Sequence, residues 1–120
     1  MATLTPTLTL VSTNASTDAL SISVTDSLTV GNPAVNVGRS DILHTAETVI
    51  IPSTVSSVNY VYLKNMDTSN FISIKTDAAV LFMNLGPEEF AFFPLNGLVG
   101  LEAQADTATC VLEYGYWTKS

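Results

Sequence analysis

The chain has 120 residues, a net charge of −7 and four cationic side chains, which suits one domain and argues against binding nucleic acid or an anionic membrane surface. With one cysteine and one histidine, it offers neither an intramolecular disulfide nor a Cys/His zinc site. Charged residues make up only 12% of the chain, and Ser and Thr side chains fill many polar positions instead. This composition suits a β-rich domain, because Thr favours strands. It also suits a subunit contact, because neutral groups are less costly to bury than ions.

The first ten residues, MATLTPTLTL, alternate between polar and apolar side chains. Leu4, Leu8 and Leu10 fall on one face and threonines on the other, which is the pattern of a strand with one covered face. Pro6 lacks an amide hydrogen, so we expect this strand to lie at a sheet edge or to start at the proline. The segment has no basic region followed by a solid apolar stretch, and apolar runs elsewhere reach about six residues, so we expect neither a signal peptide nor a membrane helix and a protein made in the cytosol.

The alternation resumes after a loop at 12–17 and continues from Leu20 to Val30, with only Asp26 breaking the pattern. We expect residues 1–30 to be either an arm that pairs with a neighbouring subunit or the first two strands of a sandwich. The next segment, 31–40, reads GNPAVNVGRS, which is rich in turn-forming residues.

The rest of the chain consists of short apolar segments of strand type. These predicted strands cover residues 48–51, 58–65, 71–75, 80–85, 89–93, 98–105 and 109–117. Residues 58–65 are apolar on both faces, which predicts a central strand, and MDTSN at 66–70 predicts a hairpin connection to the next strand. Eight to ten strands without a helical period fit a sandwich, a jelly roll or a barrel, and we predict one antiparallel, jelly-roll-like β-sandwich domain over 1–120.

The only adjacent carboxylates, Glu88 and Glu89, follow a Gly-Pro turn. If a strand begins there, consecutive side chains point to opposite faces and cannot converge on one substrate. A polar turn is therefore favoured over a paired-carboxylate catalytic site.

The other chemical groups also favour structural roles. We expect His44 to be a surface or loop residue, and Cys110 to be a buried small hydrophobe on a strand. Asp67 and Asp106 each lie among oxygen-bearing neighbours, where turns that bond to the backbone are favoured and calcium binding stays open. We find no candidate catalytic residue, cofactor site or metal site, and a hydrolase built on His44 is the least favoured function.

Aromatic residues at strand positions mostly have apolar neighbours of the same parity, as in a core. Phe92 and Phe93 are consecutive, so they cannot both face one core, and the outer one is expected in a contact together with Pro94. Trp117, with Tyr116 or Tyr114, is the alternative candidate for a sugar-binding surface.

Three segments carry a family resemblance: NYVYLKNMDTSNFISI at 59–74, LGPEEFAFFPL at 85–95 and LEAQADTATCVLEYGYW at 101–117. They resemble small β-sandwich virion proteins of tailed bacteriophages, particularly marine and cyanobacterial ones, and the opening TLTPTLTLVST is loosely similar to theirs. Such patterns often have glycine after the proline of the turn, where this chain has Glu88, so a turn that needs a positive φ would be altered there.

The resemblance implies a non-enzymatic virion protein that is made in the host cytoplasm and assembles as an oligomer. The first hypothesis is a capsid decoration or cement protein whose partners are the major capsid protein, another virion protein, or itself as a homotrimer. The second is a tail or fibre module that contacts host glycans. The residues expected at an interface are Leu4, Pro6, Leu8, Leu10, Phe92, Phe93, Pro94 and Trp117.

Overall fold

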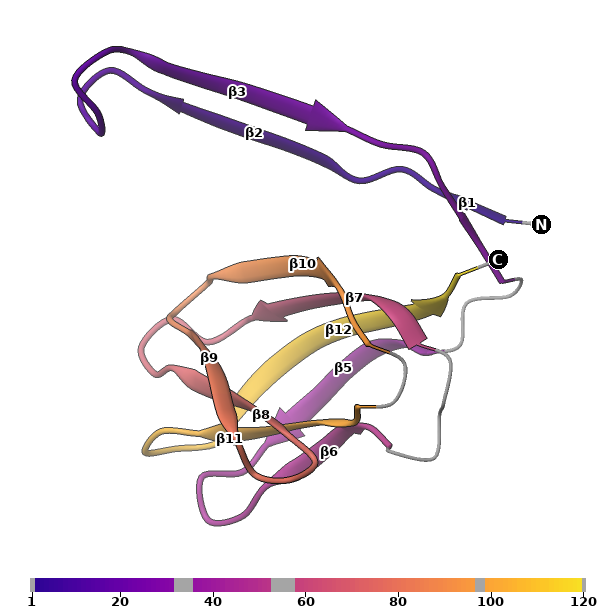
Figure 1. Ribbon diagram of the computed structural model, residues 1–120. Coiled ribbons are helices and arrows are strands. Elements are labelled where there is room, and N and C mark those ends of the chain that lie inside the picture. Colours follow the sequence, from indigo (N-terminus) through magenta and orange to yellow (C-terminus); the bar gives the residue numbers. More distant parts are fainter. Residues whose placement is uncertain (1, 32–35, 53–57, 97–98, 120) are drawn as a thin grey trace.

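Every regular element of the protein is a β-strand in the computed structural model, which describes residues 2–31, 36–52, 58–96 and 99–119. Two four-stranded antiparallel sheets face each other, and a separate two-stranded arm projects from them (Figure 1). This confirms the predicted all-β antiparallel sandwich. The described ranges contain no helix long and apolar enough to cross a membrane.

The first sheet has the strand order β10-β7-β12-β5, and the second has the order β6-β11-β8-β9. The strands of the first sheet are β5 (Asn36–Ile42), β7 (Val58–Asn65), β10 (Phe90–Pro94) and β12 (Cys110–Thr118). Those of the second sheet are β6 (Thr48–Ile51), β8 (Ile72–Thr76), β9 (Leu81–Leu85) and β11 (Leu101–Ala105). From β5 to β12, consecutive strands lie in different sheets at every step except β8 to β9.

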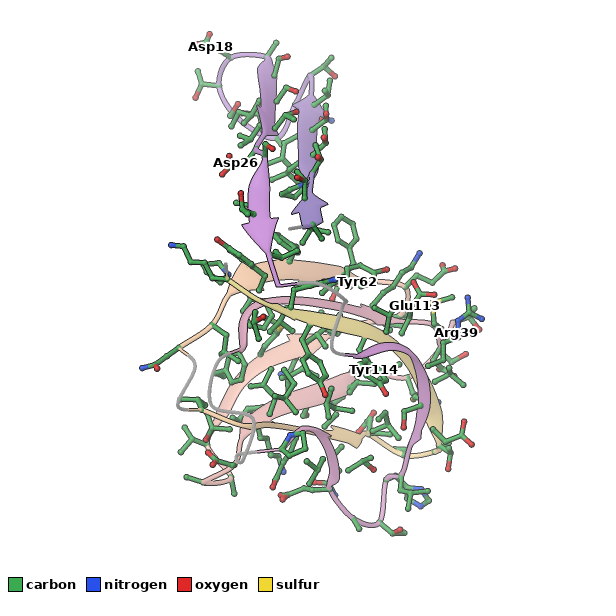
Figure 2. All side chains as sticks on the ribbon, turned by 90° about the vertical axis from the view of Figure 1, so that its right-hand side faces the viewer. Asp18, Asp26, Arg39, Tyr62, Glu113 and Tyr114 are labelled. Atoms are coloured by element: carbon green, nitrogen blue, oxygen red, sulfur yellow. The ribbon has the colours of Figure 1, made fainter. Side chains whose placement is uncertain are left out.

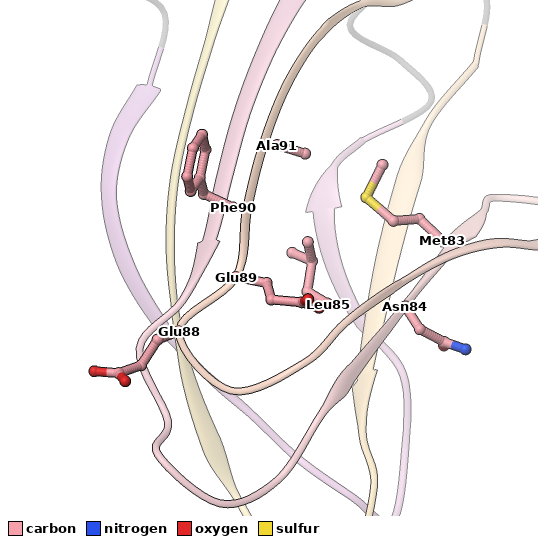
Figure 3. A pocket seen from close by; sticks show the side chains of 7 residues that line it. All are labelled: Met83, Asn84, Leu85, Glu88, Glu89, Phe90 and Ala91. Atoms are coloured by element: carbon pink, nitrogen blue, oxygen red, sulfur yellow. The ribbon is translucent and has the colours of Figure 1, made fainter. Parts of the chain in front are cut away.

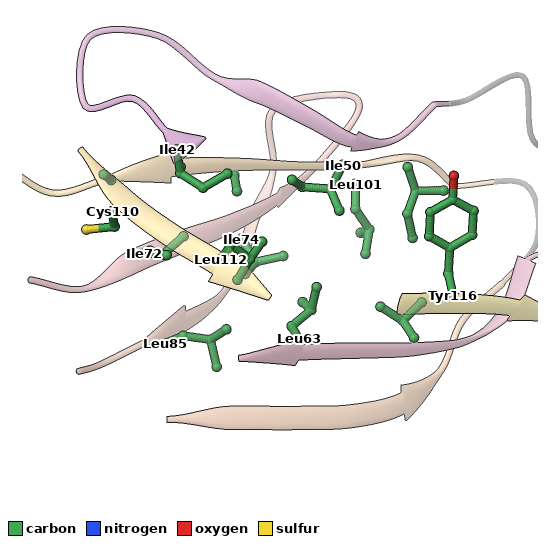
Figure 4. Close-up of a cluster of buried hydrophobic side chains, with 14 residues drawn as sticks. Ile42, Ile50, Leu63, Ile72, Ile74, Leu85, Leu101, Cys110, Leu112 and Tyr116 are labelled. Carbon is green, nitrogen blue, oxygen red and sulfur yellow. The ribbon is translucent and has the colours of Figure 1, made fainter. Parts of the chain in front are cut away.

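The core lies between the two sheets because alternate residues of their strands point inward. In β11, Leu101, Ala103 and Ala105 are buried while the intervening residues are partly exposed, and β8 begins with the same alternation. Figure 4 shows these apolar side chains meeting between the layers. The buried cluster consists of Ile42, Ile50, Ile51, Val61, Leu63, Ile72, Ile74, Leu85, Leu101, Ala103, Ala105, Cys110, Leu112 and Tyr116.

The N-terminal thirty residues form the arm, which we define as residues 2–30. It contains β1 (Ala2–Leu4), β2 (Thr7–Ser12), β3 (Leu20–Thr25) and β4 (Leu28–Val30). β2 pairs with β3 and β1 pairs with β4, and none of the four belongs to a sandwich sheet. The arm explains why the radius of gyration is 15.5 Å, above the roughly 14 Å expected of a compact chain of this length.

The base of the arm is attached to β12. The Gly31 amide donates a hydrogen bond to the Thr118 carbonyl at 2.7 Å, and Val30 forms a β-bridge with Lys119. Val30 is buried, so the end of the arm at the sandwich is packed while its far end extends into solvent (Figures 1 and 2).

The structure corrects three expectations about the elements. The described residues form twelve strands rather than eight to ten, partly because Pro6 and Asp26 each divide an alternating segment into two strands. Residues 36–40, expected as turn, belong to the edge strand β5, whose polar residues tolerate an exposed edge. The remaining residues of the expected turn, 32–35, lie outside the described residues, as does the predicted strand start at 98.

The third correction concerns residues 66–70. They do not connect a hairpin, because β7 belongs to the first sheet and β8 to the second. The hairpin lies one step later, where β8 and β9 pair around residues 77–80. The central position of β7, between β10 and β12, is confirmed.

Candidate functional site

The outer surface of the first sheet carries aromatic side chains on adjacent strands. Val61 and Leu63 of β7 are buried, so Tyr60, Tyr62 and Lys64 of the same strand face outward. Their register partners on β10 and β12 face outward as well. We call this surface the aromatic face; it comprises Tyr60, Tyr62, Phe90, Phe92 and Trp117.

The aromatic face is apolar on its β10 side. Phe90 is 62% exposed and Phe92 is 36% exposed, although large apolar side chains are usually buried. The rings of Tyr60 and Phe92 stack with their centroids 6.2 Å apart and their planes at 11°. This side of the sheet therefore presents a preorganised apolar surface rather than scattered residues.

The other side of the face contains a hydrogen-bonded polar cluster that joins three strands. Glu113 accepts a hydrogen bond from the Tyr62 hydroxyl at 2.8 Å and pairs with Arg39 at 3.1 Å (Figure 2). Partial burial and the neighbouring Glu113 raise the pKa of Tyr62 to about 12. The Tyr62 and Arg39 hydrogen bonds lower the pKa of Glu113. Near neutral pH the phenol stays protonated and the carboxylate stays ionised, so the cluster ties strands together and offers no free acid or base.

The arm also has two chemically different faces. In the β2–β3 register Leu8 lies opposite Val24 and Leu10 opposite Ile22, which places these four side chains on one face. They are 42–55% exposed. We call this surface the apolar arm face. The opposite face carries hydroxyls, such as the cross-strand pair of Thr7 and Thr25, whose side chains are 3.3 Å apart.

The apolar arm face meets the aromatic face only near the base of the arm. A cleft of about 300 Å³ opens between the two surfaces. Its lining consists of Pro6, Thr7, Leu8, Val24, Asp26, Phe90 and Phe92. Residues nearly seventy positions apart in the sequence therefore line one apolar opening.

The predicted interface residues fall into two groups. Leu4, Pro6, Leu8 and Leu10 lie on the arm, and Pro6 and Leu8 reach the same cleft as Phe92. Phe92 is the outward residue of the Phe92–Phe93 pair, which confirms that the two do not share one face.

The remaining predicted residues do not all reach this surface. Phe93 packs against the core, Pro94 is exposed beside Phe92, and Trp117 lies on the aromatic face. Tyr116 is buried in the core, so a sugar-binding pair of Trp117 with Tyr116 is wrong. Sequence reasoning missed Phe90, Ile22 and Val24, although their parity with Phe92 and Leu20 could have identified them.

The carboxylates Glu88 and Glu89 do not form a pair. Figure 3 shows Glu88 pointing away from Glu89, whose carboxylate accepts a hydrogen bond from the Gly86 amide. The Glu89 amide donates to the Gly86 carbonyl at 3.1 Å, and Glu88 has a φ of 63°. These features define a tight turn with proline at its second position and a left-handed third residue. The groove of about 550 Å³ beside this turn is a shallow opening between β9 and β10, with no converging acidic groups.

The remaining chemical groups occupy structural positions. His44 is exposed in the loop before β6, and Cys110 is buried in β12, where burial raises the pKa of its thiol. The Asp67 carboxylate accepts hydrogen bonds from the amides of Ser69 and Asn70, as expected of a turn, and these bonds lower its pKa. Over the described ranges, no cluster of three or more metal-ligating side chains occurs.

A second group of exposed apolar residues lies at the start of β9, an edge strand of the second sheet. It consists of Val80, Leu81 and Phe82, which are 45–58% exposed, and we call it the β9 patch. The Phe82 ring meets the Phe93 ring edge-on at a centroid distance of 6.2 Å, which anchors the patch to the core.

Comparisons of the chain with known protein families, curated proteins and solved structures found no match.

Proposed function

We propose that the protein is a non-enzymatic virion protein, namely a capsid decoration or cement protein that bridges capsid subunits of a tailed bacteriophage. The observation that carries this proposal is the presence of two separate exposed apolar surfaces. One combines the arm and the aromatic face on the first sheet, and the other is the β9 patch on the second sheet. A bridging protein needs two contact surfaces, and exposed apolar side chains gain free energy when they are covered.

Three carboxylates of the sandwich support a structural role rather than catalysis. Glu113, Glu89 and Asp67 all use their carboxylate oxygens in internal hydrogen bonds. Catalytic acids and bases need a free position from which to reach a substrate. The resemblance of three segments to small phage virion proteins favours the same function.

The strand order is also compatible with this role. The eight sandwich strands alternate between the sheets except at the β8–β9 hairpin, and we interpret this order as a jelly roll. Jelly rolls occur in viral capsid proteins but also in lectins and enzymes, so the fold adds only modest support.

The proposal is tested by locating the protein in intact virions. Electron cryomicroscopy and mass spectrometry of purified virions are expected to find the chain at regular positions on the outer shell. Absence of the chain from the shell would refute the cement function.

A binding assay separates the β9 patch from the rest of the surface. Purified protein is added to capsid shells that lack it, and the bound fraction is measured by sedimentation. Leu81→Glu is expected to weaken binding at least about tenfold, because it places a charge in the contact. Asn84→Glu, on an exposed polar position of the same strand, is the matched control and is expected to bind as the unmodified protein does.

Glycan binding is the second candidate, because the stacked Tyr60 and Phe92 rings resemble a platform for a sugar ring. This function places the protein on a tail or fibre. A glycan array would identify it by hits that disappear in Phe92→Ser, and the absence of any hit would argue against it.

A further inference from the structure

We propose that the apolar arm face and the aromatic face are the two halves of one contact between copies of this chain, in which the arm of one copy lies across the aromatic face of another. The inference concerns self-association and does not depend on the capsid function. It specifies the partner of a surface that a single chain leaves open.

Neither surface is closed within one chain. The two faces approach each other at the base of the arm and leave a cleft of about 300 Å³. Leu10 and Ile22, farther along the arm, do not line this cleft and stay 44% and 42% exposed. On the sheet, Phe90 lines the cleft and still remains 62% exposed. The intramolecular contact therefore covers only part of each face.

The dimensions of the two faces match. Strands of six residues, as in β2 and β3, extend about 20 Å at roughly 3.4 Å per residue. Four strands spaced about 4.8 Å apart, as in the first sheet, span a similar width. An arm laid across the sheet can therefore contact its whole outer surface.

The charges favour the aromatic face over other surfaces of a second copy. The arm carries two carboxylates, Asp18 and Asp26, and no cation. The chain as a whole is acidic, with a net charge of −7, so most of its surface repels the arm. The outer surface of the first sheet carries Lys64, whose register partner is Phe90, beside the Arg39–Glu113 ion pair, whose two charges offset each other. A second copy thus offers one cation, Lys64, beside the apolar side of its aromatic face.

Reciprocal exchange would bury an area on the scale of a specific interface. The arm face has a footprint of about 20 by 10 Å, or roughly 200 Å². In a pair that exchanges arms, two arm faces and two sheet faces are covered, which gives about 800 Å² of footprint. Accessible area exceeds footprint on a corrugated surface, so the contact approaches the roughly 1,200 Å² at which specific interfaces begin.

The arm has a natural bend for reaching a neighbour. The strand pairing is interrupted between β1–β4 and β2–β3, where the Asp26 amide bonds to the Pro6 carbonyl at 3.2 Å. The base forms a β-bridge between Val30 and Lys119, just after β12, while the outer hairpin makes no strand pairing with the sandwich. The angle of the hairpin can therefore change without breaking a sandwich sheet.

The test measures the mass of the full chain in solution by size-exclusion chromatography with light scattering. The unmodified protein is expected at two or more times 12.8 kDa. The double variant Leu10→Glu with Ile22→Glu, on the apolar arm face, is expected to weaken self-association at least about 100-fold and run as one chain. The matched control Thr9→Glu with Ser23→Glu changes the cross-strand pair on the hydroxyl face and is expected to keep the original mass.

A mixing experiment tests the two halves directly. Phe90→Ser with Phe92→Ser, on the aromatic face, is expected to be monomeric alone. Mixed with the Leu10→Glu, Ile22→Glu variant, it is expected to associate more strongly than either variant does alone, since its intact arm meets an intact aromatic face and restores one of the two contacts. Circular dichroism of each variant checks that the sandwich is folded.

Several outcomes would overturn the proposal. It would be overturned if the unmodified protein were a single chain at every concentration. Binding of an apolar dye would then show that the arm face is exposed and available to a different partner, and no dye binding would show that the arm is closed on its own sheet. An oligomer that survives Leu10→Glu with Ile22→Glu would also overturn it, as would a mixture of the two variants that associates no more strongly than either variant alone.

Discussion

Asn65 is the only buried polar side chain among the described residues, and replacing it by leucine tests what holds the end of the sandwich together. Its amide nitrogen donates to the carbonyls of Asn70, Leu85 and Gly86 at 2.9, 3.1 and 3.0 Å. Its carbonyl accepts from the Asp67 amide at 2.9 Å. One side chain thus joins the connection after β7 to the turn after β9.

Leucine has the same number and branching of side-chain heavy atoms, so Asn65→Leu removes the hydrogen bonds without opening a cavity, and its bulkier methyl groups add some overpacking. Four backbone groups lose a partner, at a net cost of about 1 kcal/mol for each bond, and more for groups that water cannot reach. We expect a loss of roughly 3 to 5 kcal/mol in the free energy of unfolding, a large share of the 5 to 15 kcal/mol typical of a domain.

The assay is urea unfolding followed by circular dichroism and by the fluorescence of the single tryptophan. Asn84→Leu is the matched control, because Asn84 is exposed and makes one side-chain bond with Ser73 at 3.0 Å. We expect the control to change stability by about 0.5 kcal/mol or less. A loss below about 1 kcal/mol in Asn65→Leu would refute the role assigned to these bonds.

Asn65→Asp adds a pH signature to the same position. An ionised carboxylate would face three carbonyl oxygens, whereas a protonated carboxyl can donate to one of them. The folded state therefore raises the pKa of this aspartate, and its stability relative to the unmodified protein should improve as the pH falls. A stability difference that does not depend on pH would contradict this reasoning.

Three further predictions follow from local geometry. Glu88 and Ala79 have φ values of 63° and 61°, in the left-handed region where a Cβ is unfavourable. Glycine at either position should therefore stabilise the protein by about 0.5 to 1 kcal/mol, measured as a higher urea midpoint of unfolding. A lower midpoint would contradict the turn assignments. The pKa of Asp67 is lowered, so its charge stabilises the fold at pH values above the ordinary pKa of 3.8, and this stabilisation disappears as the pH falls through the folded-state pKa. The free energy of unfolding of Asp67→Asn should therefore differ most from that of the unmodified protein near neutral pH. An equal difference at low pH would argue against this role of the charge. At Gly115 an added Cβ would lie 2.8 Å from the Trp117 ring. Gly115→Ala should therefore displace the ring, shift the tryptophan emission and lower the free energy of unfolding by about 1 kcal/mol. An unchanged emission spectrum would show that the ring does not cover this glycine.

The sandwich class was predictable because alternation is a local property of the sequence. A strand places successive side chains on opposite faces, so alternation predicted the segments that form β2, β3 and β12. The same parity placed Phe92 and Phe93 on opposite faces and Cys110 in the core. The edge strand β5 was missed because an exposed edge accepts the polar and glycine residues that also form turns.

Strand pairing was decided only in the tertiary structure. The connection at 66–70 has the composition of a hairpin turn, yet it carries the chain from one sheet to the other. The buried Asn65 stabilises this crossing through carbonyls as distant as Leu85, which no local pattern reveals. An asparagine at a strand end usually indicates a solvated turn, so its burial could not be predicted.

The sequence by itself determined an all-β chain whose hydroxyl-rich N-terminal segment alternates in strand fashion. Only the tertiary structure decided that this segment leaves the sandwich as an arm and that Pro6 and Leu8 meet Phe90 and Phe92 at one cleft. The physical reason is that alternation specifies which side chains share a face, whereas the surface that covers a face depends on contacts between residues far apart in the chain.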